Sequence, residues 1–185
     1  MKEPRKEGTA QQARPAGKRR WVRWLRDIGL LVLAFVLIQW WQSRNLIEGP
    51  APPLVGHLLD GSPYQLAASQ RPVLVHFWAT WCPICRLEQD SIASIAADWP
   101  AIIIATTSGS AEEVSGYMLE DGLTMPVLLD ENGDIARRWG VQGVPATFIV
   151  DGDNHIRYAG MGYATEAGLR LRLWLTRILH KGGSA

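Results

Sequence analysis

The chain has 185 residues, of which 47% are apolar and 20% are charged, so it is long enough for one compact domain and an additional segment. This apolar content is too high for a disordered chain, and two cysteines are too few for a scaffold held together by disulfides. Residues 1–27 carry nine Lys and Arg against three Asp and Glu, whereas residues 28–185 carry ten against fifteen. Because the positive charge is confined to the N-terminal part, the composition argues against a nucleic-acid-binding domain.

The N-terminal part divides into a polar tail and an apolar segment. Residues 1–20 are basic and show no hydrophobic periodicity, so we expect a disordered cytoplasmic tail. Residues 21–43 hold an apolar run with tryptophans at both ends. A helix from Trp21 to Trp41 would be about 31 Å long, close to the thickness of a hydrocarbon core. The segment therefore predicts a transmembrane signal-anchor, with the basic N-terminus in the cytoplasm and the rest of the chain across the membrane.

The alternative for the apolar segment is a cleaved secretory signal. The eleven apolar residues 28–38 also fit the core of a signal peptide. Residues 39–48 offer no convincing cleavage site, however, and Pro52 would obstruct cleavage within residues 49–51. The retained anchor is therefore the favoured interpretation.

The remaining chain predicts a small α/β domain over residues 54–180, after a proline-rich extended spacer at 44–53. Apolar and β-branched runs predict strands at 73–78, 101–106, 127–129, 146–150 and 155–159. Helical periodicity predicts helices at 83–98, 110–119 and 165–179. The residues expected to face the core from the first and last helices are Leu87, Ile92, Ile95 and Ala96, and Leu169, Leu173 and Ile178.

The two cysteines, Cys82 and Cys85, lie between a predicted buried strand and the helix that follows it. The helix N-terminus should stabilise a thiolate at Cys82, which makes Cys82 the expected attacking sulfur. Cys85, one turn further along, is then the resolving cysteine. Pro83 suits the first helical turn because it has no N–H to leave unsatisfied.

Other uses of two cysteines are less consistent with this spacing. A structural disulfide across two residues would gain little stability, and a zinc site normally needs a second pair of ligands. The sequence therefore favours a redox-active dithiol that needs no cofactor and no metal. The alternative function is a Cu(I)-binding or copper-delivery protein in which the same two thiolates are the ligands.

Two segments of the sequence resemble a known family. Residues 77–85, FWATWCPIC, resemble the active-site strand, turn and helix of thioredoxins, and residues 143–148, GVPATF, resemble their cis-proline loop. With the single anchor, the pattern resembles the membrane-tethered TlpA/ResA/DsbE-like branch, and within it the suppressor-of-copper-sensitivity thioredoxin-like proteins. The resemblance covers residues 50–180. It implies a thioredoxin fold, with a central mixed β-sheet flanked by helices.

The resemblance also implies roles for residues beside the cysteines. It implies a cis peptide bond between Val144 and Pro145, packed against the dithiol. The Val144 backbone would then pair with an extended substrate, and Trp81 and Pro83 would belong to the same substrate-binding surface. The alternative is that Pro145 does no more than begin a strand.

Two further residues have an open role. His76 stands where ordinary thioredoxins carry a buried Asp, so the resemblance implies a proton relay for Cys85 with a pKa nearer neutrality. The alternative is a hydrogen-bonded core histidine. Glu88, three residues after Cys85, matches an acidic position of the branch and would either tune the site or be a solvated helix charge.

The function implied by the resemblance is a protein thiol–disulfide oxidoreductase in the periplasm, attached to the bacterial inner membrane by a single helix. A reducing role is favoured, in cytochrome c maturation or copper-stress tolerance. Its partners would be proteins with disulfides or dithiols, and a membrane electron carrier of the thiol–disulfide interchange type. No nucleic-acid partner is expected.

Overall fold

The computed structural model describes residue 21 and residues 24–34, 37, 46–68 and 71–182. Two units separate along the chain, Met1–Ile38 and Gln39–Ala185. In the first unit, residues 24–34 are helical and their side chains are exposed. Within the described part of the chain, no helix is both long enough and apolar enough to cross a membrane. The predicted tail at 1–20 and parts of the predicted anchor at 21–43 lie outside the described residues.

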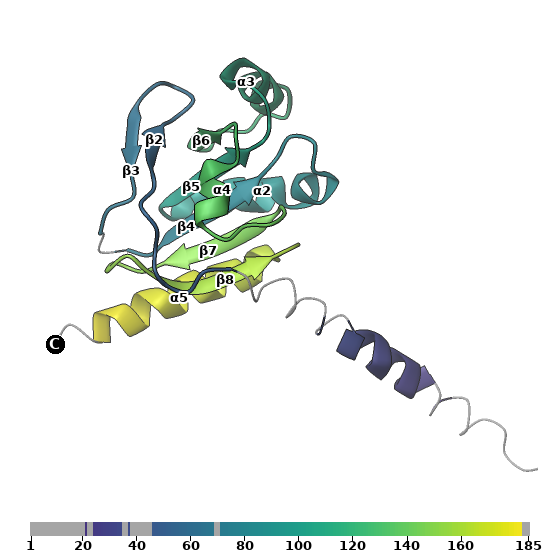
Figure 1. The fold of residues 1–185 in the computed structure, drawn as a ribbon. Helices are drawn as coiled ribbons and strands as arrows, with labels where there is room; N and C mark the ends of the chain where they lie inside the picture. The colour runs from purple at the N-terminus through teal and green to yellow at the C-terminus, as the bar shows by residue number, and fades with distance from the viewer. Residues whose placement is uncertain (1–20, 22–23, 35–36, 38–45, 69–70, 183–185) are drawn as a thin grey trace, which may run out of the picture. The chain divides into compact units, whose positions relative to one another are not determined.

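The second unit is built on a six-stranded mixed sheet with the order β1-β8-β7-β4-β5-β6 (Figure 1). Its strands are β1 (Gly49–Pro50), β4 (Val73–Trp78), β5 (Ala101–Thr106), β6 (Val127–Asp130), β7 (Ala146–Val150) and β8 (His155–Met161). Strands β4, β5 and β6 run parallel to one another. Strand β7 is antiparallel to β4, β8 is antiparallel to β7, and β1 is antiparallel to β8. Strands β2 (Val55–His57) and β3 (Pro63–Gln65) form a separate antiparallel pair.

The connections between the strands carry four helices. They are α2 (Pro83–Asp98), α3 (Ala111–Glu120), α4 (Asp134–Arg138) and α5 (Glu166–Gly182). The parallel strands are joined through α2 and α3, as parallel connections require, and the short turn at residues 151–154 joins β7 to β8. The predicted central mixed sheet with flanking helices is confirmed.

Alternation along the strands gives the sheet two buried faces. In β4, Val73, Val75 and Phe77 pack with α4 on one face, which we call the α4 face. Leu74 and Trp78 pack on the other face, the α2 face, together with both cysteines and the inner sides of α2 and α5. Because side chains alternate with a period of two, His76 projects to the α2 face, on the side of the sheet that carries the dithiol.

The elements predicted at 73–78, 83–98, 101–106 and 146–150 are confirmed to the residue. The segment predicted as an extended spacer at 44–53 is, where it is described, packed against the domain. Leu46 is buried in the core, and Gly49 and Pro50 pair with β8 as its outer neighbour. The N–H of Ala51 also donates to the Asn154 carbonyl at 2.7 Å, so the described part of the segment is attached to the sheet.

Two predicted core positions are wrong. Leu87 is 74% exposed, and the neighbouring Glu88 is fully buried in its place. Ile178 is 46% exposed, and Thr176 takes the inner position of α5 instead. In both cases the exposed apolar residue lies on a different face of its helix from the correctly predicted core positions, which are Ile92 and Ile95 on α2 and Leu169 and Leu173 on α5.

Candidate functional site

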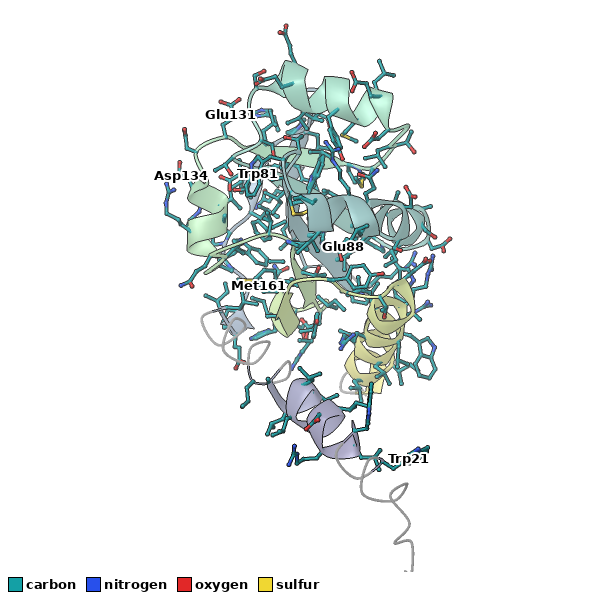
Figure 2. The ribbon with its side chains drawn as sticks, turned by 90° about the vertical axis from the view of Figure 1, so that its right-hand side faces the viewer. Trp21, Trp81, Glu88, Glu131, Asp134 and Met161 are labelled. Atoms are coloured by element: carbon teal, nitrogen blue, oxygen red, sulfur yellow. A yellow bond between two sulfur atoms is a disulfide. The ribbon has the colours of Figure 1, made fainter. Side chains whose placement is uncertain are left out.

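The two cysteines form a disulfide at the point where β4 leads into α2. Figure 2 shows it as the yellow bond at the start of the helix. Cys82 is the N-cap residue of α2, and its sulfur accepts the N–H of Cys85 at 3.2 Å. Pro83 occupies the first helical turn, where an N–H would have no partner. A negative charge on the Cys82 sulfur would therefore be stabilised by the end of the helix.

Both cysteines are covered in the disulfide form. Cys82 is 3% exposed and Cys85 is 2% exposed, so burial does not separate the expected attacking sulfur from the resolving one. The surface beside them is apolar and open, since Trp81 is 62% exposed and Ile84 is 46% exposed. The Trp81 indole N–H donates to the Thr107 carbonyl at 2.9 Å, which connects the start of α2 to the end of β5.

The loop that precedes β7 lies against the disulfide. The peptide bond between Val144 and Pro145 is cis, as the resemblance implies. The Val144 carbonyl oxygen lies 3.7 Å from the Cys82 sulfur. A disulfide sulfur has no proton to donate, so this is a packing contact in the oxidised form. The backbone of Val144 is thus the part of this loop in contact with the predicted attacking atom.

A groove of about 260 Å³ runs beside the disulfide and collects residues from three loops. Trp81 comes from the start of α2, Thr107 from the end of β5, and Val144 from the cis-proline loop. Arg137, on α4, is also in its lining, and its side chain is 65% exposed. Thr107 has a φ of 46°, a left-handed backbone that is rare for a β-branched residue and is concentrated at functional sites.

His76 and Glu88 meet on the α2 face, beneath the first turns of the helix. The Nε2 atom of His76 lies 3.6 Å from Oε1 of Glu88, and both side chains are buried. The Nδ1 atom of His76 shares a hydrogen bond of 2.9 Å with the Thr147 hydroxyl, its cross-strand neighbour in β7. Oε2 of Glu88 accepts the N–H of Ala164 at 2.9 Å, whereas Oε1 has no hydrogen-bond partner.

Burial shifts the pKa values of this pair in opposite directions. It lowers the pKa of His76 to about 3, because the charged imidazolium is disfavoured in the core. Burial also raises the pKa of Glu88 to about 7, although the hydrogen bond from the Ala164 N–H opposes that shift. Both groups are therefore neutral between these two values. The expectation that His76 titrates near neutrality is wrong, and Glu88 has the near-neutral pKa instead.

The structure brings most of the predicted site residues to one place. Cys82 and Cys85 form the disulfide, Trp81 and Val144 line the groove beside it, and Pro83 and Pro145 follow Cys82 and Val144 directly in the chain. His76 and Glu88 lie together on the α2 face of the sheet. Four contributors were not predicted: Thr107, Arg137, Thr147 and the backbone of Ala164. Their contributions depend on cross-strand register and loop contacts, for which the sequence carries no signal. Among the described residues, no three His, Cys, Asp or Glu side chains are placed to hold a metal ion together.

Comparison with known proteins extends these observations. A family model described as Redoxin matches residues 47–170. The thiol:disulfide interchange protein DsbE of Escherichia coli strain K12 is 28% identical over 163 residues, which cover 78% of this chain and 85% of that protein. DsbE of Haemophilus influenzae is 36% identical over 121 residues, which cover 62% of this chain and 67% of that protein. The crystal structure of a thioredoxin family protein from Chlorobium tepidum TLS, described as a thiol:disulfide interchange protein, has a TM-score of 0.62 at 24% identity. It covers 71% of this chain and 97% of its own, and shows that the two share one fold.

Proposed function

Because the chain belongs to the Redoxin family and to its DsbE-like branch of thiol:disulfide oxidoreductases, we propose that it exchanges disulfides with other proteins through Cys82 and Cys85. The observation that carries this proposal is the position of the disulfide, which joins the N-cap of α2 to its first turn and contacts the cis-proline loop. That position supplies a stabilised sulfur anion and an adjacent backbone for an extended substrate.

The reaction proceeds as two thiol–disulfide exchanges. In the reduced protein, the Cys82 thiolate attacks one sulfur of a substrate disulfide, and the other substrate sulfur leaves as a thiolate and is protonated. A mixed disulfide between Cys82 and the substrate is the intermediate. Cys85 then loses its proton and attacks the Cys82 sulfur, which breaks the mixed disulfide. The substrate leaves fully reduced, and the protein holds the Cys82–Cys85 disulfide.

The second exchange needs a group that takes the proton of Cys85. Glu88 lies one turn after Cys85 on α2, and its pKa of about 7 suits proton transfer near neutral pH. His76, with its pKa lowered to about 3, is a weak base, and its ring packs against the carboxyl group at 3.6 Å. In this scheme Glu88 is the proton acceptor and His76 is a positioning residue.

The cellular setting of the reaction is also part of the proposal. The charge asymmetry and apolar run at the N-terminus support an anchor at 21–43 in the inner membrane, with residues 54–180 in the periplasm as the catalytic domain. A membrane electron carrier of the thiol–disulfide interchange type would return the disulfide to the dithiol. The relatives named DsbE are thiol:disulfide interchange proteins, which supports the exchange chemistry. A reducing role in cytochrome c maturation rests on the sequence resemblance. A role in copper-stress tolerance rests on the sequence resemblance alone.

A trapping experiment tests the proposed chemistry. Cys85→Ser keeps the attacking sulfur but removes its resolving partner, so mixed disulfides with substrates should accumulate and be identifiable by mass spectrometry. Cys82→Ser is the matched control and should trap none. Trapping by Cys82→Ser but not by Cys85→Ser would reverse the two roles.

An insulin-reduction assay beside an anaerobic Cu(I) titration separates exchange from copper binding. We expect reductase activity. Tight, stoichiometric binding of Cu(I) without reductase activity would contradict the proposed function and support the copper-binding alternative.

A further inference from the structure

Helix α5 is apolar on two opposite faces. Leu169 and Leu173 are fully buried against the α2 face of the sheet. The opposite face carries a second row at helical spacing, which we call the outer stripe, and its members are 42–75% exposed: Leu171, Trp174, Leu175, Ile178 and Leu179. Positions i, i+3, i+4, i+7 and i+8 lie side by side on a helix, so these side chains form one continuous apolar surface. An apolar surface of this kind marks an interaction site.

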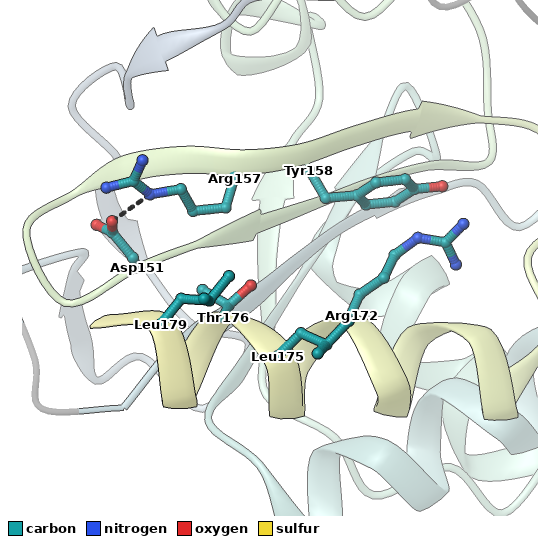
Figure 3. Close-up of a pocket in the computed structure, with 7 residues that line it drawn as sticks. All are labelled: Asp151, Arg157, Tyr158, Arg172, Leu175, Thr176 and Leu179. Atoms are coloured by element: carbon teal, nitrogen blue, oxygen red, sulfur yellow. Dashed lines mark hydrogen bonds and ion pairs between the residues drawn. The ribbon is translucent and has the colours of Figure 1, made fainter. Parts of the chain in front are cut away.

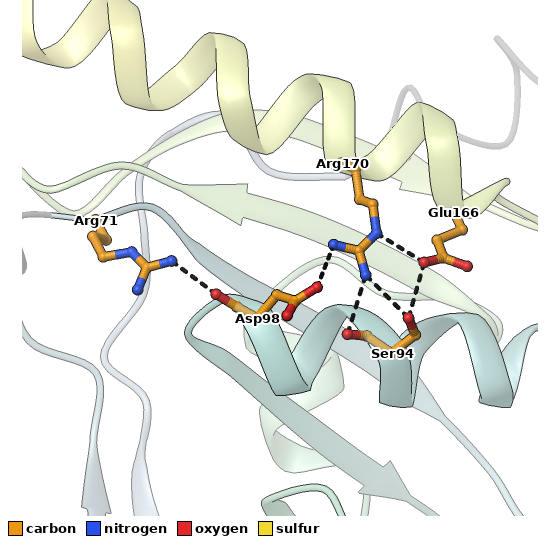
Figure 4. A network of polar contacts seen from close by, with 5 residues as sticks. All are labelled: Arg71, Ser94, Asp98, Glu166 and Arg170. Atoms are coloured by element: carbon orange, nitrogen blue, oxygen red, sulfur yellow. Dashed lines mark hydrogen bonds and ion pairs between the residues drawn. The ribbon is translucent and has the colours of Figure 1, made fainter.

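The charges beside the outer stripe are of one sign. From residue 167 to residue 182, α5 contains arginines and a lysine but no Asp or Glu. Arg170 is held by an internal network, since it pairs with Glu166 and Asp98 at 2.8 Å each (Figure 4). Arg172 stacks 4.4 Å from the centre of the Tyr158 ring, and Arg177 is half-buried on the same helix. Arg172 and Arg177 therefore add positive charge on either side of the stripe.

A groove of about 470 Å³ between α5 and β8 extends this surface. Figure 3 shows that Leu175 and Leu179 of the outer stripe also line the groove, with Arg157 and Arg172 above them. Arg157 is paired with Asp151 at 2.5 Å and is 56% exposed. The surface thus combines an apolar base with guanidinium groups at its border.

We propose that the outer stripe of α5, with the adjoining groove, lies in the headgroup region of a membrane that contains anionic lipid. A helix with an apolar face, basic borders and a tryptophan has the composition of a segment that lies in a membrane interface. The leucines and Ile178 enter the boundary of the acyl chains, and Arg172 and Arg177 contact the phosphates. A second copy of the chain is a poorer occupant, because it would bring the same arginines together, and the carboxylate that lines the groove, Asp151, is already paired with Arg157.

The proposal is independent of the redox chemistry and is tested on the full chain. An environment-sensitive fluorescent amino acid is incorporated at Ile178, and in a matched chain at Leu119, which is 84% exposed on α3. Each chain is reconstituted with vesicles of phosphatidylcholine, with or without phosphatidylglycerol. With phosphatidylglycerol, the emission at position 178 should shift to shorter wavelength and resist an aqueous quencher, whereas position 119 should not respond.

Charge reversal tests the role of the arginines. The double change Arg172→Glu and Arg177→Glu should weaken the response at position 178 by about tenfold or more. The control is Arg138→Glu on α4, which should have no effect. Insulin reduction by the double variant in detergent should be unchanged, which separates this surface from the proposed catalytic function and shows that the variant is folded.

Three results would overturn the proposal. One is an absence of response at position 178. Another is an equal response at positions 178 and 119. The third is resistance to the aqueous quencher at position 178 in the absence of lipid, because a protein segment would then be the occupant of this surface.

Discussion

The Nε2 atom of His76 lies 3.6 Å from Oε1 of Glu88, and neither side chain is accessible to solvent. At this distance the two atoms are in contact but are not hydrogen-bonded. Their shifted pKa values keep the imidazole and the carboxyl group neutral over most of the acidic range, so the pair is not an ion pair there. Ionisation of Glu88 near pH 7 therefore places a negative charge in the core one turn from Cys85.

The first prediction concerns proton transfer from Cys85. In the unaltered chain, resolution of the mixed disulfide should accelerate as the pH rises through about 7, where Glu88 becomes able to accept a proton. Glu88→Gln should slow that step by about 10²-fold and remove the inflection near pH 7, leaving the pH dependence of the Cys85 thiol itself, while attack by Cys82 changes little. Stopped-flow kinetics that follow the two steps separately measure both. Equal slowing of attack and resolution would exclude Glu88 as the acceptor.

The second prediction concerns His76. His76→Phe keeps an aromatic ring in β4 but removes the polar atom beside Glu88, so the pKa of Glu88 should rise further. The pH midpoint of the resolution step should move upward with it. Thr147→Val, which removes the partner of His76 Nδ1, is the milder comparison and should shift the midpoint less in the same direction. An unchanged midpoint in a folded His76→Phe protein would reduce His76 to a packing residue.

The third prediction concerns stability. The pKa of Glu88 is about 7 in the folded chain against an ordinary value of 4.5, so the folded state retains a proton that the unfolded state has lost. The contribution of Glu88 to the free energy of unfolding should therefore decline as the pH rises from about 4.5 to 7, by up to about 3 kcal/mol, whereas the lowered pKa of His76 contributes in the opposite direction up to its ordinary value of 6.5. Glu88→Gln should lack this decline. Urea titrations of the two oxidised proteins across that range measure the difference, and parallel pH curves would contradict the pKa shift.

The fourth prediction concerns substrate choice in the groove beside the disulfide. Arg137 is in the lining of that groove, so its charge should favour substrates with acidic residues near the reacting disulfide. Arg137→Glu should reduce the rate with an acidic disulfide peptide by about twofold to fivefold and favour a basic one, as expected for exposed charges. The neighbouring Arg138 is exposed but is not among the lining residues, so Arg138→Glu is the control. An equal effect of both changes would mean that the response reflects net charge.

The fifth prediction concerns the anchor. A reporter fused after Ala185 should be active when it reads the periplasm and inactive when it reads the cytoplasm. The protein should also stay with membranes during alkaline carbonate extraction. Recovery of a soluble form that begins near Ala51 or Pro52 would show that the N-terminal segment is a cleaved signal.

The sequence predicted the parts of the fold that depend on local pattern. The strand at 73–78 and the helix at 83–98 follow from apolar runs and a helix-initiating Pro83, and the two motif segments located the site. Helix α4 was missed because Asp130, which precedes it, looks like a turn residue. Its carboxylate in fact accepts the N–H groups of Ile135 and Ala136 at 2.9 Å and so initiates the helix.

The electrostatic part of the site could not be predicted in the same way. Glu88 was expected either to tune the site or to be solvated, because a charged residue in a helix is usually exposed. Its burial and its contact with His76 follow from its place on the inner face of α2, which it shares with Ile92 and Ile95, whereas Leu87 lies on the outer face. Neither residue's pKa is accessible without that packing.

The pairing of β1 with β8 has a practical consequence for shortened versions of the chain. A chain that begins at Leu54 would lose Leu46 from the core and the two residues that pair with His155 and Ile156. The outer edge of β8 would then offer unpaired backbone groups to another chain, which is how sheets associate edge to edge and aggregate. Soluble versions should therefore start ahead of Leu46, so that His155 and Ile156 keep their partners.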